Sequence, residues 1–232
     1  MKPDARPQPS RSAWMVGSTS PASLMVVTGT LGIAAVSWVV AVRQMRGMDM
    51  GAATDLGPLP FFMGVWVPMM AAMMLPGAVP ALSRFVRTGG RAVVAPLFAG
   101  SYLAVWTLVG LAVYVVYRPH GSFAAGVLTI AAGCYELTPL KRTCRRRCRE
   151  RVRSGFAFGV HCLGSSAGLM LLLVALGVMS IGLMAVVAVV VLVHKVLPPS
   201  PWLDVPVALA IVALGIVIII APASVPGIIP TM

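Results

Sequence analysis

Charged side chains are scarce in this sequence, and acidic ones are the scarcest. Only 10% of the 232 residues are charged, and only six are Asp or Glu, whereas 59% are apolar. A soluble domain has about 45–50% apolar and about 25% charged residues. A soluble chain of this size buries only about two-thirds of its surface, so many of these apolar side chains would be exposed to water. The composition excludes soluble enzymes, secreted disulfide scaffolds and disordered chains, and it predicts an integral membrane protein.

The sequence also lacks the motifs of an enzyme. It shows no pairing of a nucleophile with a base, no phosphate-binding loop and no cofactor fingerprint. We therefore expect a protein without catalytic activity. A net charge of +12 could suit nucleic acid, but the basic residues lie between apolar runs, where the positive-inside rule places them. We expect no nucleic-acid partner. The lipid bilayer is the expected partner of most of the protein surface.

Long apolar runs are what the sequence has in abundance. A helix needs near 20 apolar residues to cross the hydrocarbon core, and only helices or closed barrels can do so. The runs are too long and too uniform for strands, so we predict an all-α polytopic bundle of six to seven spans. It forms a single transmembrane domain over 21–228, after a basic cytoplasmic tail over 1–20. The predicted spans are 22–42, 60–82, 93–117, 122–139, 156–177, 180–197 and 205–225, the last being the weakest.

The placement of lysine and arginine predicts the orientation. In a seven-span arrangement, 15 of the 18 basic residues fall on the side of the N terminus, and only Arg43, Arg46 and Arg118 fall on the other. Because basic loops stay in the cytoplasm, we expect a cytoplasmic N terminus. All four cysteines would then face the reducing side, where disulfides are rare and thiols stay free for ligation.

Methionines gather near the predicted outer face. Eight of the 15 lie between positions 45 and 74. Met45, Met48 and Met50 share the first outer loop, while Met70 and Met74 share one face of the second span. Thioethers are soft ligands that select Cu(I) over hard cations, so both groups are candidate copper ligands. Packing of an irregular apolar interior is the alternative for each group. Three prolines in the second span predict a kinked and central helix.

A second group of candidates lies at the predicted inner ends of three spans. It comprises Glu136, His161, Cys162 and His194, and ionisable residues inside a span indicate function by default. They could form a metal site or a proton-linked site. The alternative is structural, with Glu136 paired to Lys141, Arg142 or Lys195. The basic loop that holds Cys144 and Cys148 is better suited to anionic lipid than to an arriving cation.

Three stretches of the chain resemble a known bacterial family. They are Gly133-Cys-Tyr-Glu-Leu-Thr-Pro-Leu-Lys through Cys148, Trp66 through Pro76, and His161-Cys162-Leu-Gly164 through Met179. This family, a domain of unknown function, is described as a predicted metal-binding integral membrane protein. The resemblance covers roughly 60–198 and implies a multi-pass protein of the inner, or plasma, membrane of a bacterium, with metal binding. The chain departs from the family at Ser165 and Ser166, where the family pattern has two cysteines.

The sequence thus supports two functional hypotheses. The first is binding or handling of a soft metal of the Cu(I) type, with copper as the expected ligand. The second is a non-catalytic membrane scaffold or assembly subunit that holds no metal. Either could involve a membrane or periplasmic partner protein.

Overall fold

The computed structural model describes residues 21–46, 56–87, 92–149, 154–177 and 180–224, and this part of the chain is helical with no strand. This confirms the all-α helical bundle predicted from the sequence. Eight α-helices follow one another, together with the short 3-10 turns η2 (Ala92–Val94) and η3 (Pro222–Ser224). The helices are α1 (Pro21–Met45), α2 (Leu59–Arg87), α3 (Ala95–Val116), α4 (Ser122–Glu136), α5 (Pro139–Arg149), α6 (Gly155–Leu176), α7 (Ile181–Val196) and α8 (Pro201–Ile220).

Each of the seven predicted apolar runs coincides with a helix, but the helices differ in length. Within the described chain, five are long and apolar enough to cross a membrane, namely α1, α2, α3, α6 and α8. A sixth crossing is obtained if α4 and α5, which are bent by 58° relative to each other, form one broken span. Helix α7 has only 16 residues. These lengths are compatible with a multi-pass membrane protein.

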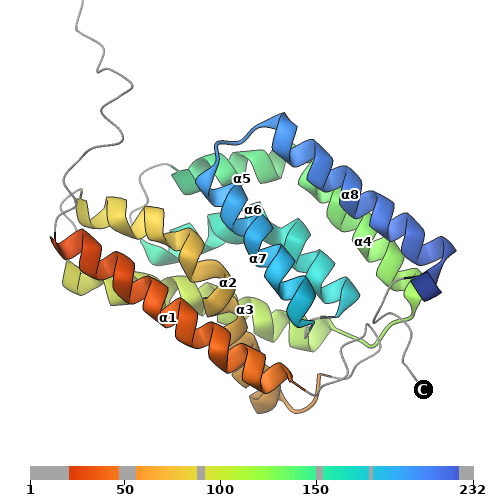
Figure 1. Cartoon of the computed structure of the whole chain (residues 1–232), viewed down its shortest axis with the longest axis horizontal. Helices are drawn as coiled ribbons and strands as arrows, with labels where there is room; N and C mark the ends of the chain where they lie inside the picture. The colour runs from red at the N-terminus through yellow and green to blue at the C-terminus, as the bar shows by residue number, and fades with distance from the viewer. Residues whose placement is uncertain (1–20, 47–55, 88–91, 150–153, 178–179, 225–232) are drawn as a thin grey trace, which may run out of the picture.

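Two helices organise the bundle. Helix α6 packs against α3, α4, α5 and α7, and α2 packs against α1, α3 and α7. Figure 1 shows α6 and α7 in the middle, with α1, α2 and α3 on one side and α4 with α8 on the other. Helix α5 lies across one end of the bundle, because the chain turns sharply before Pro139.

The central position predicted for the second span is confirmed. Helix α2 holds Pro68, Pro76 and Pro80 and is the most buried of the long apolar helices. Its side chains pair with α3 through the Trp66 indole, whose Nε1 donates to the carbonyl of Trp106 at 2.8 Å. A buried location explains why three prolines are tolerated, since neighbouring helices surround the backbone carbonyls that they free.

Helices α4 and α8 meet at unusually close range. A Cβ added at Gly126 would lie 2.9 Å from the carbonyl oxygen of Gly215, and the reverse distance is also 2.9 Å. Glycine at both positions therefore lets the two backbones touch, as small residues do between membrane helices. This contact brings the N-terminal end of α8 next to the end of α4, where the charged residues described below lie.

Candidate functional site: a sulfur group and an ionic cluster

Four helices contribute to a compact set of side chains that we call the sulfur group. Met74 comes from α2, Tyr102 from α3, Cys162 from α6 and Lys195 from the last turn of α7. Met74, Tyr102 and Cys162 are fully buried, at 0% exposure, and Lys195 is half-buried. The central helices α2 and α6 thus provide the two sulfur atoms, and α7 provides the charge.

The Lys195 ammonium lies between these sulfur atoms. Its Nζ donates to Cys162 Sγ at 2.8 Å and to Tyr102 Oη at 3.2 Å, and it lies 3.9 Å from Met74 Sδ. The Tyr102 hydroxyl lies 3.2 Å from the same Cys162 sulfur. The rings of Tyr102 and Phe158 face the ammonium, with centroids 5.7 and 5.8 Å away. The site therefore surrounds a monovalent cation with soft and aromatic groups, which favour such a charge.

A third sulfur approaches from α5. Cys148 is buried, it hydrogen-bonds Ser165, and it interacts electrostatically with Cys162 and Lys195. Burial raises the pKa of the Cys148 thiol to about 12. Without a metal, Cys148 is therefore a neutral thiol at physiological pH, and becoming a ligand would require it to lose a proton.

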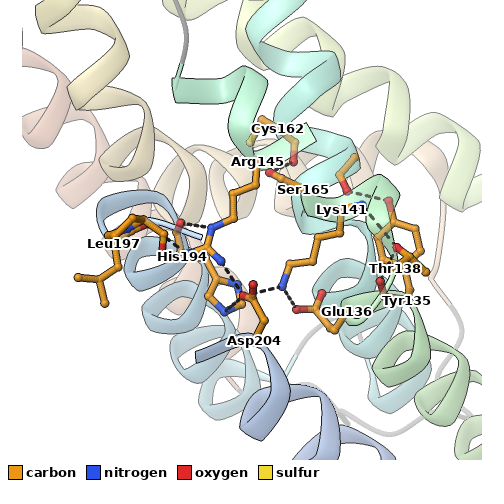
Figure 2. Close-up of polar contacts among 12 residues, drawn as sticks. Tyr135, Glu136, Thr138, Lys141, Arg145, Cys162, Ser165, His194, Leu197 and Asp204 are labelled. Carbon is orange, nitrogen blue, oxygen red and sulfur yellow. Dashed lines mark hydrogen bonds and ion pairs between the residues drawn. The ribbon is translucent and has the colours of Figure 1, made fainter. Parts of the chain in front are cut away.

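Next to the sulfur group lies a buried ionic cluster of Glu136, Lys141, Arg145, His194 and Asp204 (Figure 2). Lys141 donates to Glu136 Oε2 and lies 3.4 Å from Asp204 Oδ1. The guanidinium of Arg145 donates to the same Asp204 oxygen at 2.6 Å and to the carbonyl of His194 at 2.7 Å. Two carboxylates thus balance two cations, which is the condition for keeping charges inside an apolar bundle.

Some polar atoms of the ionic cluster remain without hydrogen bonds. Among the described residues, neither ring nitrogen of His194 has a hydrogen-bond partner, and Glu136 Oε1 has none. The carboxylate oxygen Oδ1 of Asp204 lies 3.7 Å from Nε2 of this ring. The cluster is therefore well paired in charge, while its histidine is held mainly by packing.

The structure divides the four inner candidate ligands: Glu136 and His194 lie in the ionic cluster, whereas Cys162 lies in the sulfur group. Glu136 pairs with Lys141, as one predicted alternative had it, and Cys162 contacts Lys195 instead. His161 is only half-buried. In the part of the chain that is described, no three His, Cys, Asp or Glu side chains are placed to hold one metal ion.

The methionine candidates divide in the same way. Met70 and Met74 are buried in α2, and Met45 is buried at the end of α1. Met48 and Met50 lie outside the described residues, so the outer methionine group stays a prediction. Of these candidates, Met74 is the one that belongs to the sulfur group, with its Sδ 3.9 Å from the Lys195 ammonium.

Sequence reasoning missed three residues that matter here. Asp204 was not considered, although it is a lone acid just before a long apolar run, a signal that could have found it. Arg145 was assigned to a lipid-facing loop, but α5 is a helix whose inner face buries Lys141, Arg145 and Cys148. Tyr102 gave no signal, because its role depends on how α3 packs against α6.

The fold and the site together define a class of protein: an α-helical bundle whose described part has five or six helices long and apolar enough to span a membrane, with buried soft donors around a cation. Residues 63–218 match the model of the PpoB2 family, described as "Copper chaperone", and the chain belongs to this family. The match runs from α2 into α8 and includes both the sulfur group and the ionic cluster. No curated protein and no solved structure matches the chain.

Proposed function

We propose that this protein binds and hands on Cu(I) within a bacterial plasma membrane, as a multi-pass protein with a cytoplasmic N terminus and no catalytic step. The observation that supports this most is the convergence of Cys162 Sγ and Met74 Sδ on one cation, each within 3.9 Å of the Lys195 nitrogen. Membership in a family described as copper chaperones supports copper as the cargo.

The donor chemistry suits Cu(I) rather than a hard cation. A thiolate and a thioether are soft ligands, and neither attracts Mg²⁺ or Ca²⁺ strongly. Two sulfur donors meet at this site, which suits an ion that accepts a low coordination number, and Cys148 offers a further sulfur nearby. In this proposal Cys162 and Met74 bind the ion. Cys148 is a third ligand that binds it while it enters or leaves at the α5 end of the bundle.

The outer methionines fit the same function at the opposite end of the bundle. Met45 is buried where α1 ends, close in sequence to Met48 and Met50. A thioether group there would offer Cu(I) a second station, from which a periplasmic partner could receive or deliver it. The alternative function, a scaffold without metal, is the outcome if the titrations below find no binding.

Replacing the inner sulfur ligands is expected to reduce Cu(I) affinity by at least tenfold for each change. Cys162→Ser exchanges a soft thiolate for a hydroxyl, and Met74→Leu keeps the bulk but removes the thioether. Affinity is measured by competition with a chromophoric Cu(I) chelator on protein purified in detergent under anaerobic conditions.

Matched controls are available for both residue types. Cys134 is exposed and Met25 is 73% exposed, so Cys134→Ser and Met25→Leu should leave affinity unchanged. A third variant with Met45, Met48 and Met50 changed to leucine tests the outer station separately. No Cu(I) binding by the parent protein would refute the proposed function, and equal losses in the controls would refute the assigned ligands.

Lys195→Met is expected to raise Cu(I) affinity by about tenfold or more. The ammonium now lies where the ion would bind, so Lys195 has to swing aside on loading, and two cations at this distance repel each other. Methionine has a similar reach, removes the charge and adds a thioether. The same chelator competition measures the change. Weaker binding in this variant would contradict a competing role for Lys195.

A further inference from the structure

A small cavity opens beside the sulfur group, where four helices meet at the α5 end of the bundle. It has a volume of about 30 Å³ and is lined by residues of α2, α5, α6 and α7. Four of the lining side chains are basic, namely Arg84, Arg145, Arg149 and Lys195. None of the described residues that line it is acidic.

The four cations differ in how far their charges are already balanced. Arg145 is paired with Asp204, and Lys195 is engaged by Cys162 and Tyr102. Arg84 and Arg149 have contacts with neutral groups. Arg84 donates to the carbonyls of Pro80, Cys148 and Arg149. Arg149 donates to the carbonyl of Val196 at 3.2 Å.

Arg84 and Arg149 also lie close enough to repel each other. The described part of the chain contains two carboxylates, Glu136 and Asp204, and both are buried in the ionic cluster. The described structure therefore brings two like charges together without a carboxylate between them. An anion bound between the two guanidinium groups would reduce this repulsion.

We propose that this cavity is a binding site for a phosphate group, supplied by the headgroup of an anionic phospholipid or by free phosphate. Arginine forks match phosphate oxygens with two parallel hydrogen bonds, which lysine cannot do. The cavity is large enough to hold a water molecule, so it admits a phosphate oxygen. The rest of the group lies at the mouth, where Arg84 and Arg149 are exposed.

The position in the fold agrees with this ligand. Arg84 lies near the end of α2, and Arg149 ends α5, which crosses the end of the bundle (Figure 1). Basic pockets between membrane helices at this depth face the phosphates of the adjacent leaflet. The backbone contact from Arg84 to α5 and the contact from Arg149 to Val196 join three helices at the pocket, so a bound phosphate would hold their ends together.

The test is retention of phospholipid by the full-length protein in detergent, measured by native mass spectrometry. The probes are phosphatidylglycerol, zwitterionic phosphatidylcholine and inorganic phosphate. We expect phosphatidylglycerol to be retained and phosphatidylcholine to bind at least tenfold more weakly. The variant with both Arg84→Gln and Arg149→Gln should bind phosphatidylglycerol about tenfold more weakly or worse, because two charge contacts are lost.

The control is a pair of arginines on the outer face of the same helix. Arg142 and Arg147 are exposed and do not line the cavity, so Arg142→Gln with Arg147→Gln should change affinity by less than about threefold. Equal losses in the two pairs would overturn the proposal in favour of a general basic surface. If inorganic phosphate binds the parent protein and needs the same arginines while no anionic lipid is retained, free phosphate is the source, and the absence of binding by both phosphatidylglycerol and inorganic phosphate overturns the phosphate site.

A second variant guards against a folding defect. Arg84→Lys with Arg149→Lys keeps both charges but removes the guanidinium forks. We expect partial retention of phosphatidylglycerol, between the values of the parent and the glutamine variant. Retention equal to the parent would overturn the role of the forks and with it the pocket as the binding site.

Discussion

Asp204→Asn is expected to lower the free energy of unfolding by about 3–5 kcal/mol, the range seen when one partner of a buried ion pair is removed. One oxygen of Asp204 accepts from Arg145 at 2.6 Å and lies 3.4 Å from Lys141, and the residue is 1% exposed. Asparagine keeps the shape but leaves two buried cations with one carboxylate. Few other single changes in the described chain would leave so much charge unbalanced.

Unfolding of Asp204→Asn in mixed micelles of SDS and a mild detergent, followed by circular dichroism, measures this loss. Arg142→Gln is the control, since Arg142 lies on the exposed face of α5 and should change stability by less than about 0.5 kcal/mol. A loss below about 1 kcal/mol for Asp204→Asn would contradict the view that this carboxylate balances buried charge.

Glu136→Gln is expected to cost about 3 kcal/mol, and a second change should restore most of it. Glu136 and Lys141 are both 0% exposed and form a direct ion pair. Removing the acid alone leaves the Lys141 ammonium with Asp204 at 3.4 Å, which it must share with Arg145. Changing both partners, Glu136→Leu with Lys141→Met, removes the charges together and leaves the pair of Arg145 and Asp204 in balance.

The same SDS titration gives a double-mutant cycle for this pair. We expect the double variant to lie within about 1 kcal/mol of the parent, because buried pairs exchanged for apolar residues are often neutral or stabilising. Additive losses would mean that Glu136 and Lys141 act independently. Unchanged stability together with lost Cu(I) binding in Glu136→Gln would instead assign the carboxylate to function.

The sequence predicted the helices well, because membrane insertion depends on properties that are local in the chain. Each apolar run long enough to cross the bilayer coincides with a helix, and α2 is central as its prolines indicated. The pairing of Glu136 with Lys141 was also foreseeable, since the two are about one helical turn apart and the long lysine stem can bend back. Cys134 comes two residues before Glu136, which places it on the opposite side of the helix, and it is exposed.

The rest of the site depends on which helices pack together, and that information is not local. Lys195 reaches Cys162 because α7 lies against α2 and because Gly77 leaves room, since a Cβ there would overlap the Lys195 side chain. Asp204 finds Arg145 across 59 residues of sequence. The arginine-rich segment after α4 forms the amphipathic helix α5, bent by 58° from α4, rather than a loop. The number of its charges alone does not reveal that one face of this helix is buried.

Helix α8 has a consequence for the order in which the molecule is completed. It packs chiefly on α4, through the Gly126 and Gly215 contact, and its first turn contributes Asp204. Synthesis runs from the N terminus, so Lys141 and Arg145 are made before their second acid exists. The nascent bundle has two inward cations and Glu136 alone until the last helix docks. Docking of α8 is thus the step that brings the second carboxylate to the buried Lys141 and Arg145 side chains.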